Sequence, residues 1–201
     1  MEEWSDQEIG LINEVEIFRL KPSIMQKAED RLIELRDKLV FEIDRKKLAV
    51  PPKTDIVKGQ IVRGENHKGF PFVSLDMPQR FSRDEMFTYR VLFWWGHCLA
   101  FSFILKGEAL ETWLSKIMER RESKEDIYFS LAPSPWEWEL SDLNYIPLSR
   151  AFRKDLKSAA TENQYVKLAR FRPVSTSSFR KLNWVNEGLD TFRVMTGLFM
   201  D

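Results

Sequence analysis

The chain has 201 residues, 43% of them hydrophobic and 31% charged, which is typical of a folded globular protein and not of a disordered one. Lys plus Arg and Asp plus Glu each number 31, so no net charge attracts the chain to nucleic acid or to a membrane. A single cysteine, Cys98, excludes an internal disulfide and a cysteine-based zinc site. The first residues lack the basic and apolar regions of a signal peptide, so we expect a cytoplasmic protein.

The chain begins with helical patterns. Residues 5–20 are expected to form a first helix, with Ser5 or Asp6 as its N-cap. Pro22 fits the first position of a second helix that extends to about residue 47. Apolar residues recur in this second helix at steps of three or four and predict one packing stripe, formed by Met25, Ala28, Leu32, Leu35 and Leu39.

The centre of the chain is an aromatic run, Met86–Lys106, interrupted at Gly96 and His97. Its aromatic and β-branched residues suit a pleated strand, and glycine supplies the positive φ of a tight turn. Arg90 within the run argues against a membrane-spanning helix. A buried helix stays open as an alternative, because short apolar runs are ambiguous by periodicity alone. We expect a hairpin of two central strands, Met86–Trp94 and Cys98–Lys106.

Further strands and helices are predicted on both sides of this hairpin. The strands are Ile56–Arg63, Phe70–Leu75, Ile127–Leu131 and Tyr165–Pro173, and the helices are Gly107–Arg121, Ser149–Ala160 and Phe179–Met200. Met77–Glu85 is expected to be a polar connection into the hairpin. Pro71 predicts that its strand lies towards a sheet edge, because proline cannot donate to a neighbouring strand.

The order of these elements predicts an α+β fold. We expect a mainly antiparallel sheet built on the central aromatic hairpin, with N-terminal, middle and C-terminal helices packed on it. The whole chain, residues 1–201, is expected to form one domain, in which residues 1–50 are a helical segment packed on the sheet body.

Seven tryptophans are many for this length and suggest a binding surface. The alternation of Trp136-Glu137-Trp138-Glu139 predicts an extended segment with both tryptophans on one side, and Trp94 and Trp95 lie at the hairpin tip. Tryptophan is enriched in interface hot spots, although large aromatic residues also cover protein cores. Our first hypothesis is therefore a non-catalytic module, without a cofactor, that binds a small molecule or a protein partner through these four side chains.

A second hypothesis is an enzyme that uses the two histidines, His67 and His97, as acid–base groups together with Glu65 or Asp76. Neither histidine has the helical spacing of a metal site, so we expect no metal. Cys98 follows His97 directly, but neighbours in a strand point to opposite faces, which favours a small buried hydrophobe over a nucleophile. No catalytic signature is present, so the sequence favours a non-catalytic protein and leaves the enzyme open as an alternative.

A third hypothesis is polyanion binding through the basic window from Arg150 to Lys181. Its principal basic residues are Arg150, Arg153, Lys157, Lys167, Arg170 and Arg172, interleaved with aromatic residues. These positions fall on a helix and a strand that need not share a face, and the acidic N-terminal third can neutralise them. We therefore do not expect nucleic acid as the partner.

The order of features resembles the YktB-like family of uncharacterised bacterial proteins. The resemblance is carried by Arg19-Leu20-Lys21-Pro22 before a long amphipathic helix, Gly69-Phe70-Pro71-Phe72 before a strand, the aromatic hairpin, the helix from Glu108 and the closing apolar helix. It implies a compact α+β fold with helices against an antiparallel sheet. It implies no catalytic residue, because the function of that family is not established, and Phe72 stands where the family has a histidine. The oligomeric state stays open, with a homo-oligomer among the alternatives.

Overall fold

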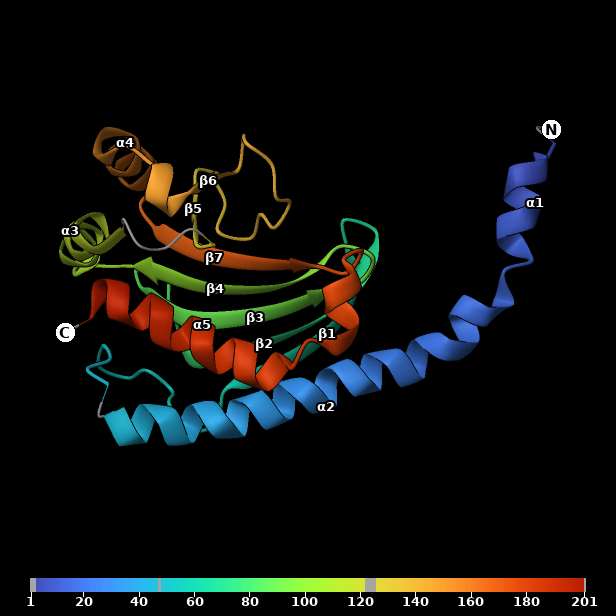
Figure 1. Ribbon diagram of the computed structural model, residues 1–201, viewed down its shortest axis with the longest axis horizontal. Helices are drawn as coiled ribbons and strands as arrows, with labels where there is room; N and C mark the ends of the chain where they lie inside the picture. Colours follow the sequence, from blue (N-terminus) through green and yellow to red (C-terminus); the bar gives the residue numbers. More distant parts are fainter. Residues whose placement is uncertain (1–2, 47, 122–125, 201) are drawn as a thin grey trace.

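A single antiparallel sheet of seven strands, in the order β1-β2-β3-β4-β7-β5-β6, organises the part of the chain that the structure describes. The structure is a computed structural model that describes residues 3–46, 48–121 and 126–200 (Figure 1). The strands are β1 (Gln60–His67), β2 (Phe70–Phe81), β3 (Met86–Trp94), β4 (Cys98–Lys106), β5 (Tyr128–Ser130), β6 (Tyr145–Pro147) and β7 (Val166–Pro173). The helices are α1 (Asp6–Ile12), α2 (Val15–Lys46), α3 (Leu110–Arg120), α4 (Arg153–Asn163) and α5 (Trp184–Phe199). The predicted α+β fold is confirmed.

The central hairpin of β3 and β4 is present with the predicted ends. Its strands pair in one unbroken register from Met86 opposite Lys106 to Trp94 opposite Cys98. Gly96 takes a φ of 75° in the turn, which glycine adopts without strain. All of β4 except Lys106 is buried, because this strand is covered on both faces of the sheet.

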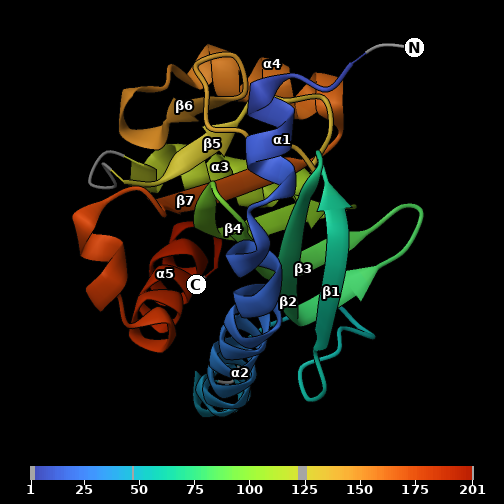
Figure 2. The same ribbon diagram turned by 90° about the vertical axis from the view of Figure 1, so that its right-hand side faces the viewer.

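One face of the sheet is covered by α2 and α5, which lie side by side beneath the strands (Figures 1 and 2). The predicted stripe of α2 is buried here, from Met25 to Leu39. The hydroxyl of Tyr89 on β3 donates to the carbonyl of Gly188 on α5 at 2.7 Å. A Cβ added to Gly188 would lie 2.6 Å from Leu35, so glycine permits the close approach of the two helices.

The other face is covered by the segment 131–146, which folds over β4 and β7. Two carbonyls of this segment, those of Pro135 and Glu137, accept hydrogen bonds from the ammonium of Lys167 at 2.9 and 2.6 Å. Trp138 of the segment packs with Trp94 of β3 in a second buried cluster. The sheet therefore has a helix-covered face and a segment-covered face.

The predicted boundary between the first two helices is wrong. The break lies at Asn13 and Glu14, whereas Pro22 lies inside α2. The predicted cap is present, since the Ser5 hydroxyl accepts from the amide of Glu8 at 3.3 Å and the Glu8 carboxylate accepts from the amide of Ser5 at 2.7 Å. Pro22 has no amide hydrogen, so α2 passes through it with one backbone hydrogen bond fewer. The buried stripe that fixes α2 to the sheet begins after this position, at Met25.

Two strand predictions before the hairpin also need correction. β1 begins at Gln60, because the Asp55 carboxylate accepts backbone amides of residues 57–59 and turns the preceding chain. β2 continues to Phe81 through most of the predicted polar connection. The prediction that Pro71 places its strand towards a sheet edge is wrong, since β2 pairs with both β1 and β3. The carbonyl of Pro71 accepts a hydrogen bond from the amide of Trp95.

The segment that carries Trp136 and Trp138 is not an extended strand, and its two rings differ in burial. The Glu137 carboxylate accepts the backbone amides of Trp138 and Glu139 at 2.9 and 2.8 Å and bends the segment. Trp138 is consequently buried, while Trp136 is 40% exposed. β6 follows this segment and was not predicted from the sequence.

Candidate functional site

The structure brings two of the four candidate tryptophans together. Trp94 and Trp138 line a pocket of about 280 Å³ at the tip of the central hairpin, on the segment-covered face. Its other lining residues are His97, Cys98, Glu139, Leu140, Phe171 and Pro173. Trp136 lies elsewhere, with its ring centroid 4.4 Å from the guanidinium carbon of Arg90. Trp95 packs against the helix-covered core.

Lys167 lies beneath this pocket and has no exposed surface. Its ammonium lies 3.4 Å from the ring centroid of Trp138, in addition to its two carbonyl acceptors. Burial lowers the pKa of Lys167 well below its usual value. Lys167 thus holds the segment 131–146 on the sheet through two carbonyls and the ring of Trp138. Because its side chain is buried, Lys167 is not accessible to a polyanion.

The two histidines both contact Trp94. The ring of His97 stacks on it with centroids 3.6 Å apart, and the ring of His67 meets it edge-on at 5.0 Å. Burial lowers the pKa of His67. The carboxylates proposed to assist them are engaged elsewhere, since Glu65 pairs with Lys21 and Asp76 binds Arg90 at 2.6 Å.

Within the described residues, neither imidazole is hydrogen-bonded to a carboxylate, as an acid–base pair requires. Burial raises the pKa of the Cys98 thiol to about 12, which keeps it protonated and unreactive. No group of three or more His, Cys, Asp or Glu side chains in the described ranges could hold a metal ion. The pocket presents aromatic and apolar side chains together with His97 and Glu139.

The six basic candidates do not form one surface. Arg170 and Arg172 point to the helix-covered face, where they pair with Asp126 at 2.9 and 3.1 Å and Arg170 also pairs with Asp190 at 2.9 Å. Lys167 is on the opposite face of the same strand because strand neighbours alternate. The exposed members are Arg150, Arg153 and Lys157, which precede or lie on α4.

A feature that was not predicted from the sequence lies at the start of the chain. Every residue from 3 to 20 is exposed, and we call this stretch the N-terminal arm. α1 and the first turns of α2 extend beyond the end of the sheet (Figures 1 and 2). The arm carries large exposed hydrophobic side chains: Trp4, Ile9, Leu11, Ile12, Val15, Ile17, Phe18 and Leu20. Burial on the sheet body begins only at Met25.

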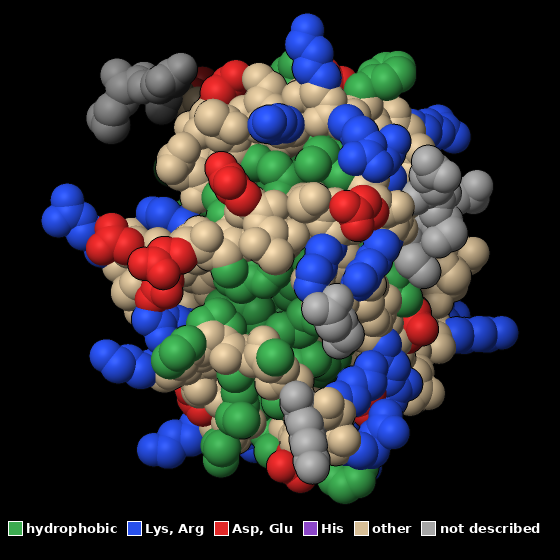
Figure 3. Space-filling model, turned by 90° about the vertical axis from the view of Figure 1, so that its left-hand side faces the viewer, with side chains coloured by type: hydrophobic (Ala, Val, Ile, Leu, Met, Phe, Trp, Pro, Cys, Tyr) green, Lys and Arg blue, Asp and Glu red, His purple; other side chains and the backbone are tan. Residues whose placement is uncertain are grey.

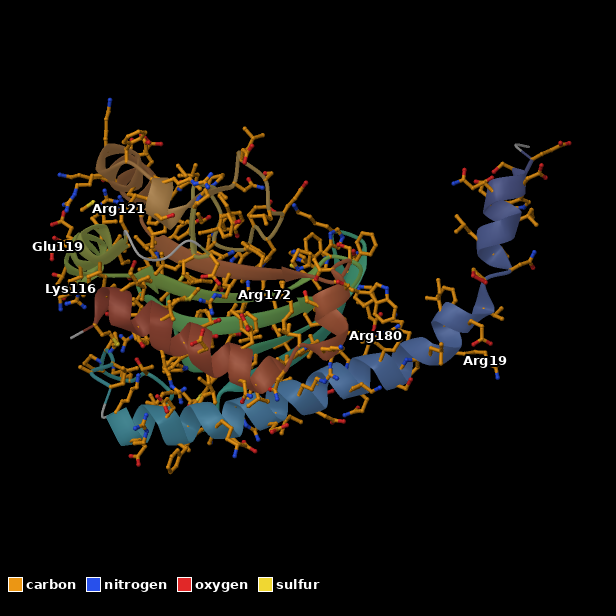
Figure 4. The ribbon with its side chains drawn as sticks, viewed as in Figure 1. Arg19, Lys116, Glu119, Arg121, Arg172 and Arg180 are labelled. Atoms are coloured by element: carbon orange, nitrogen blue, oxygen red, sulfur yellow. The ribbon has the colours of Figure 1, made fainter. Side chains whose placement is uncertain are left out.

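The arm is also acidic. The first 18 residues contain six Asp or Glu and no Lys or Arg, which leaves a net charge of +6 on the remainder of the chain. Arg19 marks the end of this acidic stretch on the projecting part of α2 (Figure 4). The zero net charge of the whole chain therefore conceals a separation of charge along the molecule.

The opposite end of the molecule carries a hollow of about 490 Å³ between α2, α3 and α5, which we call the far-end groove. It is lined by Lys46, Leu48, Ala49, Thr112, Trp113, Lys116, Arg193, Thr196, Gly197, Phe199 and Met200. None of these lining residues is acidic. Figure 3 shows hydrophobic side chains gathered along the middle of this end, flanked by Lys and Arg and by several Asp and Glu side chains. Lys116 and Arg121 lie at this end, far from Arg19 (Figure 4).

Comparisons with protein-family models, with curated proteins and with solved structures found no match for this chain. None of the described helices has the length and apolar character needed to cross a membrane.

Proposed function

We propose that this protein is a non-catalytic protein-binding module and that its N-terminal arm is the docking element. The observation that carries the proposal is the exposure of every arm residue together with eight large hydrophobic side chains. Contiguous apolar surface of this kind in a folded protein marks an interaction site, because its burial releases free energy.

The pattern of the arm supports enclosure by a partner. Phe18 lies seven residues, two helical turns, before Met25, and Val15 lies three residues before Phe18, so both continue the stripe of α2 that packs on the sheet. Ile17 and Leu20 lie on another side of the same helix. A helix that is apolar on several sides is normally buried. Contact on one side alone would leave apolar side chains of the arm exposed to water.

The charge of the arm specifies the chemistry of the partner. Glu14 and Glu16 accompany the apolar side chains, and the basic residues begin only at Arg19. Interfacial membrane helices carry Lys and Arg on their polar face, because membrane surfaces are anionic. An acidic arm instead fits a protein surface that combines apolar side chains with Lys or Arg.

A photo-crosslinking experiment tests this proposal on the full chain. A photoreactive phenylalanine analogue replaces Phe18, which is 71% exposed on the arm, and in a matched control it replaces Phe41, which is 68% exposed at the body end of the same helix. After irradiation in the cells of origin, we expect position 18 to give a defined adduct whose peptide contains apolar and basic residues. Equal labelling from positions 18 and 41, or no adduct from position 18, would contradict the proposal.

The pocket at the hairpin tip supports a second candidate function, the binding of a small apolar or planar molecule. Trp94 and Trp138 converge there with Phe171, and the volume of about 280 Å³ is near the lower limit for small-molecule sites. Leu140 is 44% exposed at the rim, so Leu140→Arg obstructs the pocket without disturbing the core. A metabolite that raises the melting temperature of the wild type but not of this variant would establish the site, and a flat screen would reject it.

A further inference from the structure

The far-end groove has the chemistry that the proposed function requires of a partner of the arm. We infer that the partner is a second copy of this chain, whose far-end groove receives the arm, so that copies associate head to tail. This inference rests on the proposed function. Apolar lining at Trp113 and Phe199 matches the apolar side chains of the arm. The basic lining includes Lys46 and Arg193, which share one carboxylate, that of Glu42, with Arg45, so an excess of positive charge is left there to match the acidic residues of the arm.

Charge decides between this arrangement and the pairing of two arms. Two arms side by side would bring Glu14 and Glu16 of one copy against the acidic residues of the other, which is unfavourable. An arm in the far-end groove instead meets a lining without acidic residues. The separation of −6 in the first 18 residues from +6 in the rest of the chain therefore favours contact between unlike ends.

The sizes of the two surfaces are compatible. The arm supplies 18 exposed residues, close to the roughly 20–30 that each partner contributes to a standard interface. The far-end groove continues past Ala49 and Trp113 into a neighbouring hollow of about 340 Å³, which shares these two residues. This second hollow is lined by both signs of charge, with Glu85 and Glu108 beside Arg80 and Lys106, so the acidic residues of the arm are matched to the first hollow only. The two adjoining hollows thus form a binding surface long enough for a helix-in-groove contact.

The arm cannot reach the groove of its own copy as a helix. The arm and the groove lie at opposite ends of the longest axis (Figure 1). The 22 residues of α2 from Met25 to its end span about 33 Å, whereas a helical arm of 18 residues spans about 27 Å. A contact between unlike surfaces of identical chains is heterologous, and it gives a closed ring or an open chain of copies according to the angle between neighbours.

Complementation between two variants of the full chain tests the inference. The arm variant is L11S/F18S, which removes two exposed side chains. The groove variant is G197E, since a side chain added at Gly197 meets no atom within 4 Å and carries a negative charge into the groove. Its matched control is G197A. Because all these positions are exposed, urea unfolding at low protein concentration should show that each variant is folded.

Sedimentation equilibrium should show a wild-type mass that rises with concentration, and G197A should behave in the same way. Each of the other variants should self-associate on the order of tenfold more weakly or less. An equimolar mixture of the arm and groove variants should form a 1:1 dimer and nothing larger, because it combines one intact arm with one intact groove.

Three results would overturn the inference: a wild type that stays monomeric, a groove variant that assembles like the wild type, or a mixture that stays monomeric. An adduct from position 18 to a different protein would reject the second copy as partner while leaving the proposed function standing. No adduct at all would reject both.

Discussion

Glu42 on α2 illustrates how a single buried carboxylate can stabilise this fold. Its side chain is 4% exposed and accepts two hydrogen bonds from Arg193 of α5, at 2.9 and 3.1 Å. These bonds from Arg193 lower the pKa of Glu42 to about 2, against the cost of burial. Glu42 therefore joins the two helices that cover one face of the sheet, and the joint depends on its ionisation.

We predict that Glu42 makes the protein sensitive to acid. A pKa that is lowered on folding contributes stability above the unfolded value of about 4.3, and this contribution is lost as the pH falls towards 2. Glu42→Gln should remove at most about 3 kcal/mol of pH-dependent unfolding free energy over this interval. Urea unfolding between pH 5 and pH 2 measures it, with the exposed Glu34→Gln on the same helix as control. Parallel curves for wild type and Glu42→Gln would refute the assignment.

Lys167 should produce a pH dependence of the same sign as that of Glu42, but at higher pH. Burial lowers its pKa in the folded protein, so the unfolded chain binds the proton more tightly. The unfolding free energy should therefore increase from the lowered pKa up to about 10.4, the usual lysine value, and stay level above it.

Substitution separates this contribution from those of the other titrating groups. In Lys167→Met the increase should disappear, whereas the exposed Lys157→Met should retain it. The measurement is the difference in unfolding free energy between each variant and the wild type as the pH is raised. A constant difference for Lys167→Met would show that the buried amine does not titrate in this range.

At the scale of elements, two glycines of α5 have contrasting surroundings. A Cβ at Gly188 would lie 2.6 and 2.8 Å from the methyl carbons of Leu35, a fully buried residue of α2. A Cβ at Gly197 would meet nothing within 4 Å. Replacing each glycine by alanine therefore tests two different effects on one helix: steric overlap with Leu35 at position 188, and helix propensity alone at position 197.

Gly188→Ala should destabilise the protein by about 1–3 kcal/mol, because the buried Leu35 must move. Gly197→Ala should stabilise it by up to about 1 kcal/mol, because alanine is the better helix former. Urea unfolding midpoints of the two variants test both signs. Equal shifts in the two variants would mean that α2 and α5 are not in close contact at Gly188.

The elements that were predicted correctly are those whose signal is local. The ends of β3 and β4 follow from the aromatic alternation and Gly96, which act within the hairpin itself. β6 and the segment 131–146 were missed or misassigned because contacts from distant residues position them, above all the hydrogen bonds of Lys167. Pro22 was taken as a helix start because proline is common at the first helical position, whereas α2 begins at Val15 and continues through it.

The candidate sites divide in the same way. Tryptophan content identified Trp94 and Trp138, which do meet, but only the three-dimensional fold separates them from Trp95 and Trp136. The N-terminal arm was missed because Val15 and Phe18 continue the apolar stripe of α2 past the end of the sheet. Two signals in the sequence could have found it: Ile17 and Leu20 on another side of the helix, and the absence of any Lys or Arg before Arg19.

At the scale of the whole molecule, charge and apolar surface are distributed along one axis. An acidic, apolar arm lies at one end, and a basic-lined, apolar groove lies at the other (Figures 1 and 3). Attraction between such ends depends on ionic strength, because the screening length falls from about 10 Å at 0.1 M salt to about 3 Å at 1 M. Purely apolar contact would not weaken in this way.

The head-to-tail dissociation constant should therefore rise with sodium chloride concentration. Glu14→Gln/Glu16→Gln removes two charges from the arm and should both weaken association at low salt and flatten its salt dependence. Glu34→Gln/Asp37→Asn removes the same charge from the exposed body part of α2 and should leave the salt dependence as in the wild type. Sedimentation equilibrium at several salt concentrations measures all three slopes. Equal slopes in the two double variants would mean that the acidic residues of the arm do not face the basic groove, and the contact between unlike ends would lose its electrostatic basis.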